Sequence, residues 1–315
     1  MAKVVVTGAA GMLGTSVIDT LAERHQVIAT SRTLGYQRPG VRWRLLDLTD
    51  EADLRGLLTT ERPDLVIHAA AVVNVEECER HPDQAARVHV GATKVIVDEL
   101  RGWSGALMYI STDSVYGGEK DGPYEEGDRT SPLNAYARTK LEGEVESLRL
   151  EKATVLRTNI FGWSRADRLS FAEWVLKGLV EGSELGMFRD VSYTPIHVRH
   201  LAGLIEPIWR GGVTGILHAG GATALSKLDF AVLMADEFGH PKDGIRPRDL
   251  EDAAFSARRP RNTALSSARL AGLIGGPLPG VLDGIRLMKE EFDSGWVAAV
   301  KGRRIGSGYR FWEES

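Results

Sequence analysis

The sequence contains little cysteine. Cys78 alone is present among 315 residues, which excludes an intrachain disulfide framework and fits a reducing compartment. The expected role of Cys78 is that of a small apolar residue buried on a helix. No group of His, Cys and Asp residues has metal-ligand spacing, so we predict no essential metal. His197 and His200 stand at helical spacing and are expected to be structural.

Long hydrophobic runs are also missing. No apolar run approaches the eighteen or so residues of a membrane span, and Met1 leads directly into the apolar run 4–6 without the layout of a signal peptide. A formal net charge of −4 argues against a general nucleic-acid or membrane-surface binder. With 43% apolar and 26% charged residues, the composition is typical of a soluble globular protein. We therefore expect a cytoplasmic protein with neither a nucleic-acid nor a membrane partner.

Short apolar runs alternate with helical patterns through the first half of the chain. This alternation predicts an α/β fold with a Rossmann-type, doubly wound parallel sheet, whose ligand binds at the carboxyl ends of the strands. Beyond residue 162 the alternation loosens, as expected where a substrate-binding lobe begins. Strands are predicted at 3–8, 27–30, 43–46, 65–68, 106–110 and 153–157, with later strands at 186–188, 193–196 and 215–219 and later helices at 168–182, 197–210, 226–239 and 264–274.

Glycines stand three apart where the first strand turns into a helix. At Gly8, Gly11 and Gly14 the missing side chains would let the backbone approach a diphosphate, which the helix N-terminus stabilises. Met12 and Leu13 lie within the same turn. The spacing Gly-x-x-Gly-x-x-Gly differs from the commonest dinucleotide fingerprint, and the alternative is a glycine-rich turn without a ligand.

Other strand ends extend the predicted cofactor site. Ser31 and Arg32 follow the second strand, where an NAD-preferring site would place Asp or Glu, whereas Arg pairs with a 2′-phosphate. Arg32 therefore predicts NADPH over NADH, unless it is only a solvated loop residue. The further cofactor contacts expected are Asp47 and Leu48 at the adenine ring, the small residues Ala69, Ala70 and Ala71 beside the backbone path, and Thr158 and Asn159 over the nicotinamide.

Three polar groups with a common chemistry surround the fifth strand. Thr112 follows it, and Tyr136 and Lys140 are four apart on a helix that begins at 132–134, so the last two share a helix face. A phenol has an ordinary pKa of about 10, and a nearby cation lowers that pKa toward the range useful for general acid catalysis. Tyr136 is predicted to protonate a carbonyl oxygen that Thr112 orients. The alternative is a surface tyrosine that packs beside a lysine stem.

Basic residues gather near the end of the chain. Arg258 and Arg259 precede Pro260 and Arg261, and such guanidinium groups clamp diphosphates. The alternative is a solvated basic turn.

Three motifs in this order, TGAAGMLG, STDSVYG and YARTK, resemble the extended short-chain dehydrogenase/reductase superfamily. The stretches DLVIHAAAVVNVEECE, PLNAYARTKLEGE, VLRTNIFG, GILHAGG and ARRPRNTAL are similar to the dTDP-4-dehydrorhamnose reductase family, over residues 3 to 292. The resemblance implies a Rossmann domain, NADPH, and reduction of the 4-keto group of a nucleotide-linked 6-deoxysugar. It also implies that Thr112, Tyr136 and Lys140 are catalytic, with Lys140 bonded to the nicotinamide ribose.

Two departures from related patterns bear on the substrate. Dehydratases of the superfamily have Thr-Asp-Glu where this chain has Ser114, so the acid that expels water is missing. After the fourth strand, Val73 and Asn74 replace an Ala-Tyr-Thr-like run. Substrate contacts are expected from Val73, Asn74, Asp113, Ser114, Arg258 and Arg259.

The predicted organisation has three parts. Residues 1–162 form the NADP-binding domain, to which some later segments return, residues 163–292 mainly form the substrate-binding lobe, and residues 293–315 are a C-terminal extension. The aromatic residues of the extension, Trp296, Tyr309, Phe311 and Trp312, would dock on the body or on a second subunit of a homodimer.

Two alternative functions stay open: an epimerase with tightly bound NAD, and a non-catalytic regulatory subunit resembling the β subunit of methionine adenosyltransferase.

Overall fold

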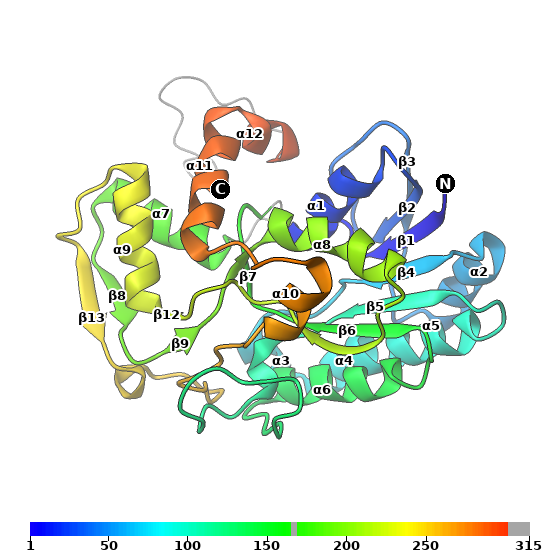
Figure 1. Ribbon diagram of the computed structural model, residues 1–315, viewed down its shortest axis with the longest axis horizontal. Helices are drawn as coiled ribbons and strands as arrows, with labels where there is room; N and C mark the ends of the chain where they lie inside the picture. The colour runs from blue at the N-terminus through cyan, green and yellow to red at the C-terminus, as the bar shows by residue number, and fades with distance from the viewer. Residues whose placement is uncertain (165–168, 302–315) are drawn as a thin grey trace.

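A parallel sheet forms the centre of the computed structural model, which describes residues 1–164 and 169–301 (Figure 1). Its seven strands follow the order β11-β6-β5-β4-β1-β2-β3, which confirms the predicted doubly wound sheet. The strands are β1 (Lys3–Thr7), β2 (Gln26–Ser31), β3 (Val41–Leu45), β4 (Leu65–His68), β5 (Ala106–Ile110), β6 (Ala153–Arg157) and β11 (Gly215–His218).

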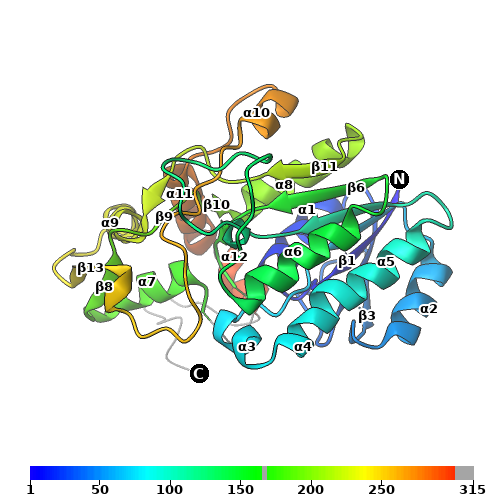
Figure 2. The same cartoon turned by 90° about the horizontal axis from the view of Figure 1, so that it is seen from below.

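Helices cover both faces of this sheet, as Figures 1 and 2 show. One layer contains α1 (Met12–Leu21) and α8 (Val198–Arg210), and the opposite layer contains α2 (Glu51–Glu61), α5 (Ala92–Leu100) and α6 (Ala135–Ser147). Successive strand residues point to opposite faces, so Val4 and Val6 pack in the α1–α8 core while Val5 packs in the other. Burial on both faces explains why these strands are almost continuously apolar.

The order of strands reverses at β1, which pairs with β2 on one side and with β4 on the other. In open sheets of this kind, ligands bind beside the carboxyl ends of the strands at such a switch point. The turn after β1 and the alanines after β4 therefore lie next to each other at the edge where the candidate site is found.

Described elements between residues 160 and 301 form a smaller lobe with its own apolar core, which includes the fully buried Phe230. Its helices are α7 (Phe171–Glu181), α9 (Lys227–Phe238), α11 (Val281–Asp293) and α12 (Trp296–Lys301), and its paired strands are β7 (Ile160–Phe161) with β10 (Ile196–His197), β9 (Ser192–Tyr193) with β12 (Leu225–Ser226), and β8 (Leu185–Phe188) with β13 (Ile245–Arg248). The helix α10 (Ala268–Ile274) lies against β11.

Several elements of this lobe escaped the sequence analysis, among them β13 and α11. The strand β13 has one buried residue, Ile245, followed by three exposed residues, so it shows neither alternation nor an apolar run. The helix α11 lies beyond the last predicted helix, although it buries a stripe that includes Ile285 and Met288. Between α4 (Pro82–Ala86) and α5, the segment Arg87–Gly91 is a π-helix.

The predicted C-terminal extension, residues 293–315, contains α12. Trp296 packs against the lobe core, and the Arg199 guanidinium lies 5.4 Å from its ring centroid. The other three aromatic residues of the extension, Tyr309, Phe311 and Trp312, lie outside the described residues. None of the helices between residues 1 and 301 that the structure describes has the length and apolarity needed to cross a bilayer.

A buried ion pair joins β6 to α6 behind the candidate site. Arg157 donates to both carboxylate oxygens of Glu144, at 2.7 to 3.2 Å, and their side chains are only 3% and 2% exposed. The Ser111 hydroxyl also donates to Glu144, at 2.5 Å. The pair therefore links the end of β5 to the helix that carries Tyr136.

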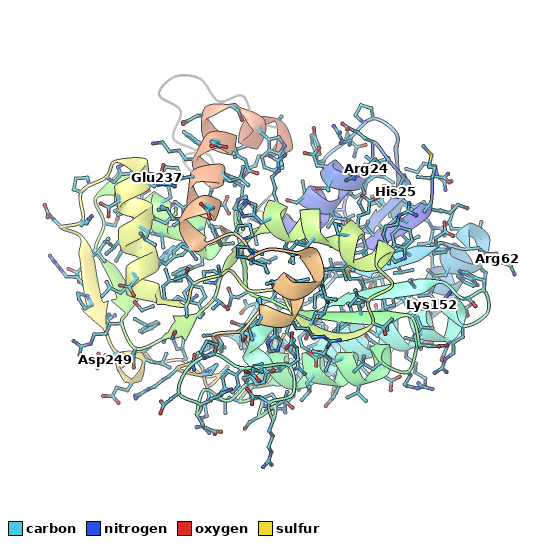
Figure 3. All side chains as sticks on the ribbon, in the orientation of Figure 1. Arg24, His25, Arg62, Lys152, Glu237 and Asp249 are labelled. Carbon is cyan, nitrogen blue, oxygen red and sulfur yellow. The ribbon has the colours of Figure 1, made fainter. Side chains whose placement is uncertain are left out.

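Replacing Arg157 by Met is expected to lower the free energy of unfolding by about 3–5 kcal/mol, because Glu144 would stay buried without its cation. Urea denaturation measures this change. Arg189→Met is the matched control, since Arg189 also donates twice to one carboxylate, that of Asp249, but at the exposed end of the lobe (Figure 3). Water screens the exposed pair of Arg189 and Asp249, so its loss should cost much less. Equal losses of stability in Arg157→Met and Arg189→Met would contradict the burial of the Arg157–Glu144 pair.

Candidate active site

The glycine turn is held against the alanines that follow β4. Gly8 has a φ of +67°, which favours glycine, and a Cβ there would lie 2.7 Å from the backbone nitrogen of Ala70. A Cβ on Gly14 would lie 2.5 Å from the Cα of Ala9. Both glycines are therefore required by close backbone contacts, of Gly8 with the segment after β4 and of Gly14 with the turn after β1.

The beginning of α1 fits the diphosphate of a dinucleotide. Gly11 precedes the helix in an extended conformation, no side chain caps the helix, and its first turn carries no acidic residue. Its first peptide N–H groups, including those of Met12 and Leu13, have no partner within the helix and attract an anion. These observations support the predicted cofactor site without testing which nucleotide it takes.

The ends of β2 and β3 place Arg32 and Asp47 in the same region. Arg32 is exposed, and the amide and hydroxyl of Thr49 donate to the Asp47 carboxylate at 2.9 and 2.8 Å. These bonds lower the pKa of Asp47, and the charge of Arg32 adds to the effect. Leu48 is buried beside them, and the Ser31 hydroxyl donates to the carbonyl of Thr33.

Thr112, Tyr136 and Lys140 come together as the sequence predicted. Thr112 follows β5, and Asn134 caps α6 by accepting from the amide of Ala137 at 2.9 Å. The Tyr136 hydroxyl lies near enough to the Thr112 side chain for Thr112 to lower its pKa. One turn further along α6, Lys140 is 2% exposed. A hydroxyl, a phenol and an amine therefore converge at the carboxyl end of β5.

The prediction that Lys140 lowers the pKa of Tyr136 is wrong for the protein without a bound ligand. The ammonium of Lys140 donates to the carbonyl of Ile110 at 2.7 Å and lies 4.0 Å from the ring centroid of Tyr109, so it is turned toward β5. Burial raises the pKa of Tyr136 to about 12, against the lowering effect of the Thr112 side chain. Burial also lowers the pKa of Lys140 to about 7, against the charge of Glu144. Tyr136 is consequently a protonated phenol at neutral pH, which is the form a proton donor needs.

Asp113 is almost fully buried next to Thr112. Its carboxylate accepts from Thr263 at 2.6 Å and from the side-chain amide of Asn159 at 2.8 Å. The hydroxyls of Thr112 and Ser114 reach its other oxygen at 3.2 and 3.3 Å. Burial raises the pKa of Asp113, and the bonds from Thr263 and Asn159 oppose that rise. Asp113 and Asn159 were predicted to contact substrate and cofactor respectively, and in the structure their side chains bond each other.

The other residues predicted to contact cofactor or substrate include Thr158, Val73 and Asn74, which differ in burial and in their hydrogen-bond partners. The Thr158 hydroxyl is buried and donates to the carbonyl of Ala219 at 2.7 Å. Val73 is 69% exposed, and the Asn74 side chain caps α3 (Val75–Arg80) by accepting from two of its amides. Contact of these residues with a ligand stays a prediction.

His89 is a site neighbour that the sequence did not reveal. It lies in the π-helix, a distortion often found at functional sites, and its ring meets the Tyr136 ring edge-on with centroids 5.9 Å apart. Its nitrogens bond the Thr139 hydroxyl at 2.8 Å and the amide of Val72 at 3.0 Å. A lone histidine within a helical pattern carries no signal of this contact.

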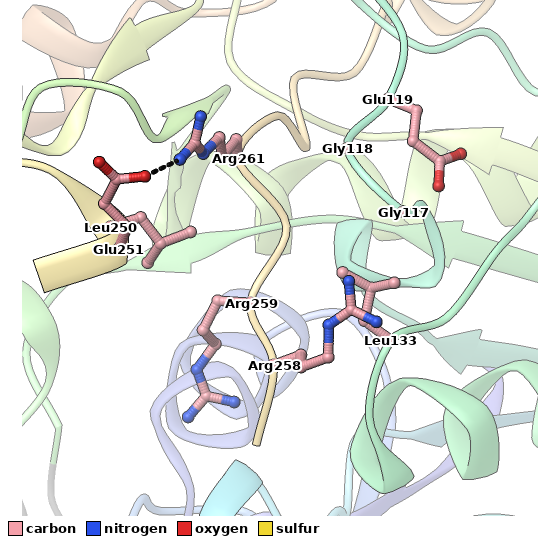
Figure 4. Close-up of a pocket in the computed structure, with 9 residues that line it drawn as sticks. All are labelled: Gly117, Gly118, Glu119, Leu133, Leu250, Glu251, Arg258, Arg259 and Arg261. Carbon is pink, nitrogen blue, oxygen red and sulfur yellow. Dashed lines mark hydrogen bonds and ion pairs between the residues drawn. The ribbon is translucent and has the colours of Figure 1, made fainter. Parts of the chain in front are cut away.

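The basic segment lines a pocket of about 450 Å³ between the two parts of the molecule. Figure 4 shows Arg258 near Leu133, on the side of the pocket that Gly117 and Gly118 also line. Arg261 pairs with Glu251 and Asp190 on the other side.

The two predicted clamp residues differ in their partners. Arg259 pairs with Glu76 at 3.0 Å, whereas Arg258 is exposed and makes none of the described ion pairs. Arg258 is therefore the freer of the two to meet an anion. Among the described residues, no group of three or more His, Cys, Asp or Glu side chains has the geometry of a metal site.

Comparisons with known proteins agree with this geometry. The family model described as the RmlD substrate binding domain matches residues 2–293. A probable low-salt glycan biosynthesis reductase from Haloferax volcanii is 30% identical, over 91% of this chain and 97% of its own length. The methionine adenosyltransferase 2 subunit beta of Danio rerio is 31% identical, over 85% of this chain and 84% of its own.

A solved structure extends the match. The hypothetical dTDP-4-dehydrorhamnose reductase from Sulfolobus tokodaii is 32% identical, with a TM-score of 0.81 over 90% of this chain and 98% of that one. The chain thus belongs to the RmlD substrate binding domain family, the dTDP-4-dehydrorhamnose reductase branch of the extended short-chain dehydrogenases/reductases.

Proposed function

We propose that the protein is an NADPH-dependent reductase of the 4-keto group of a nucleotide-linked deoxysugar. The observation that carries this proposal is the convergence of Thr112, Tyr136 and Lys140 at the end of β5. The strand β5 pairs with β4, and β4 pairs with the strand that leads into the glycine turn. A cofactor lying along this edge would therefore reach the three side chains.

Each residue has a distinct role in the proposed reaction. Bound NADPH supplies the hydride. Tyr136, protonated at neutral pH, donates its proton to the carbonyl oxygen, and Thr112 donates a hydrogen bond that orients that oxygen. Proton donation of this kind contributes roughly a hundred- to ten-thousandfold to the rate. Lys140 would use its remaining N–H groups to hold the nicotinamide ribose.

The position at which related dehydratases carry an acid to expel water holds a serine in this chain. A dehydratase needs an acid to expel water, and Ser114 stands at that position with its hydroxyl directed to Asp113. Reduction without dehydration is therefore the proposed outcome. Arg258 would bind the substrate diphosphate at the mouth of the 450 Å³ pocket.

The test is a spectrophotometric assay of NADPH and NADH oxidation with a panel of nucleotide-linked ketosugars. Oxidation of NADPH with a dTDP-4-keto-6-deoxyhexose is expected. Failure of every ketosugar, with cofactor bound, would overturn the substrate assignment. Light scattering on the same preparation tests the proposed homodimer, and the single cysteine supports a cytoplasmic setting.

Arg32 is proposed to select the cofactor. Arg32→Ala is expected to raise the KM for NADPH by roughly tenfold or more, because a bond between charged groups is lost, while the KM for NADH stays within about twofold. Arg24→Ala is the control, since Arg24 is also exposed but lies beyond the far end of α1, paired with Glu206 (Figure 3). Equal effects of Arg32→Ala on both cofactors would refute the 2′-phosphate contact.

A regulatory subunit is the second candidate, because the Danio rerio relative is named as a subunit of methionine adenosyltransferase 2. A binding module has no need of a proton donor, and Tyr136 with its Thr112 partner is intact here. Co-purification with a larger catalytic partner, without turnover of any ketosugar, would favour this candidate. Tightly bound NAD in the purified protein would instead favour the epimerase.

A further inference from the structure

The lobe contacts the catalytic loop, residues 111–116 after β5, at the buried carboxylate of Asp113. Thr263 belongs to the segment that follows the basic cluster, and its hydroxyl donates to Asp113 Oδ2 at 2.6 Å. Asp113 is 1% exposed and Thr263 is 6% exposed. A hydrogen bond to a buried charge is among the stronger ones in a protein, so this contact ties the lobe to the residue next to Thr112.

The segment around Thr263 is itself held in place. The amide of Thr263 donates to the carbonyl of Ser192 at 2.9 Å, and the amide of Leu265 donates to the Thr194 hydroxyl at 3.0 Å. On the other side, the cap residue Asn134 donates to the carbonyl of Arg258 at 2.9 Å. Thr263 is thus fixed relative to both the lobe and the helix that carries Tyr136.

The four hydrogen bonds to Asp113 are unequal. The Oδ2 atom accepts the two short bonds, from Thr263 and Asn159. The Oδ1 atom accepts longer bonds from the hydroxyls of Thr112 and Ser114, at 3.2 and 3.3 Å. The Thr112 hydroxyl has one hydrogen, so the proton it gives to Asp113 is not available to a substrate carbonyl. When Asp113 Oδ2 already accepts two short hydrogen bonds, the carboxylate competes only weakly with a substrate carbonyl for the proton of the Thr112 hydroxyl.

We infer that Thr263 is a positioning residue of the catalytic loop: by satisfying Asp113 from the lobe side, it leaves the Thr112 hydroxyl free to donate to the carbonyl oxygen. This inference rests on the proposed reductase function. Without the Thr263 hydroxyl, Asp113 draws the Thr112 proton toward itself. The loss then falls on the chemical step rather than on substrate binding.

The experiment compares Thr263→Val with Thr263→Ser. Thr263→Val is expected to lower kcat by roughly ten- to a hundredfold, as expected for a lost bond to a charged group, with the KM for substrate and the Kd for NADPH within about twofold. Thr263→Ser keeps the hydroxyl and should retain kcat within about threefold. Thr154→Val is the matched control, because Thr154, near the start of β6, also donates a short bond, 2.6 Å, but to the carbonyl of Val213 just before β11.

A double-mutant cycle tests whether Thr263 acts through Asp113. In an Asp113→Asn background, Thr263→Val should change kcat by less than about threefold, because the charge it satisfies is absent. If Thr263→Val does not fold, Thr263→Ala and Thr263→Ser give the same comparison, since they differ only in the hydroxyl. An unchanged kcat in Thr263→Val, or a raised KM with unchanged kcat, would overturn the inference.

Hydrogen exchange separates this inference from the proposed function. The amide of Ser114 donates to the Thr112 hydroxyl at 3.1 Å, so amides 112–116 should exchange faster in Thr263→Val than in wild type or Thr154→Val. This measurement needs no substrate. A wild-type protein inactive on all ketosugars would overturn the reductase proposal alone, whereas unchanged exchange would overturn the positioning role of Thr263.

Discussion

Tyr136→Phe is expected to lower kcat by about a hundred- to ten-thousandfold, the contribution of a well-placed general acid. The change removes the phenolic proton but keeps the ring, which packs edge-on against His89. Because the pKa of Tyr136 is near 12 in the protein alone, wild type holds this proton throughout the neutral range. NADPH oxidation under saturating ketosugar measures the loss, and fluorescence titration should show NADPH binding within about twofold of wild type.

Tyr193→Phe provides the control for this experiment. Tyr193 is buried, but its hydroxyl has no hydrogen-bond partner among the described residues, so its removal is expected to leave kcat close to wild type. If Tyr136→Phe turns over at the wild-type rate, another group protonates the carbonyl and the assigned acid is wrong.

The second large effect is expected from Gly14→Ala. A Cβ at this position would lie 2.5 Å from the Cα of Ala9 and 2.9 Å from its carbonyl carbon, and backbone atoms held between β1 and α1 cannot move aside cheaply. We expect the free energy of unfolding to fall by about 1–3 kcal/mol or more. The turn that cradles the diphosphate would shift with it, and losing two or three of its hydrogen bonds to a charged group would weaken NADPH binding at least about a hundredfold.

Gly56→Ala is the matched control for Gly14→Ala. Gly56 lies in the middle of α2, is exposed, and has no atom within 4 Å of the Cβ position. Alanine there should raise the free energy of unfolding by about 0.5–1 kcal/mol and leave the Kd for NADPH unchanged. Urea denaturation and fluorescence titration measure both quantities. A Gly14→Ala protein with wild-type stability and affinity would disprove the close packing of the turn.

Much of the fold could be predicted from local patterns. The strand β1 and the helix α6 are recognisable because buried strands are apolar runs and because Asn134 is a helix-capping residue. The weaker predictions concern elements whose burial depends on distant partners. The strand β13 is buried at one residue and exists because it pairs with β8, and α11 acquires its core from α9 and β10.

The sequence by itself determined the alternation of strands and helices in the first half of the chain, the spacing of Gly8, Gly11 and Gly14, and the placement of Tyr136 and Lys140 on one helix face. All of these follow from periodicity and backbone sterics within a few residues. Tertiary structure alone decided where Lys140 points, since Ile110 lies thirty residues away. It likewise decided that Thr263 bonds Asp113 across 150 residues, because such contacts depend on how separate elements pack and leave no local pattern in the chain.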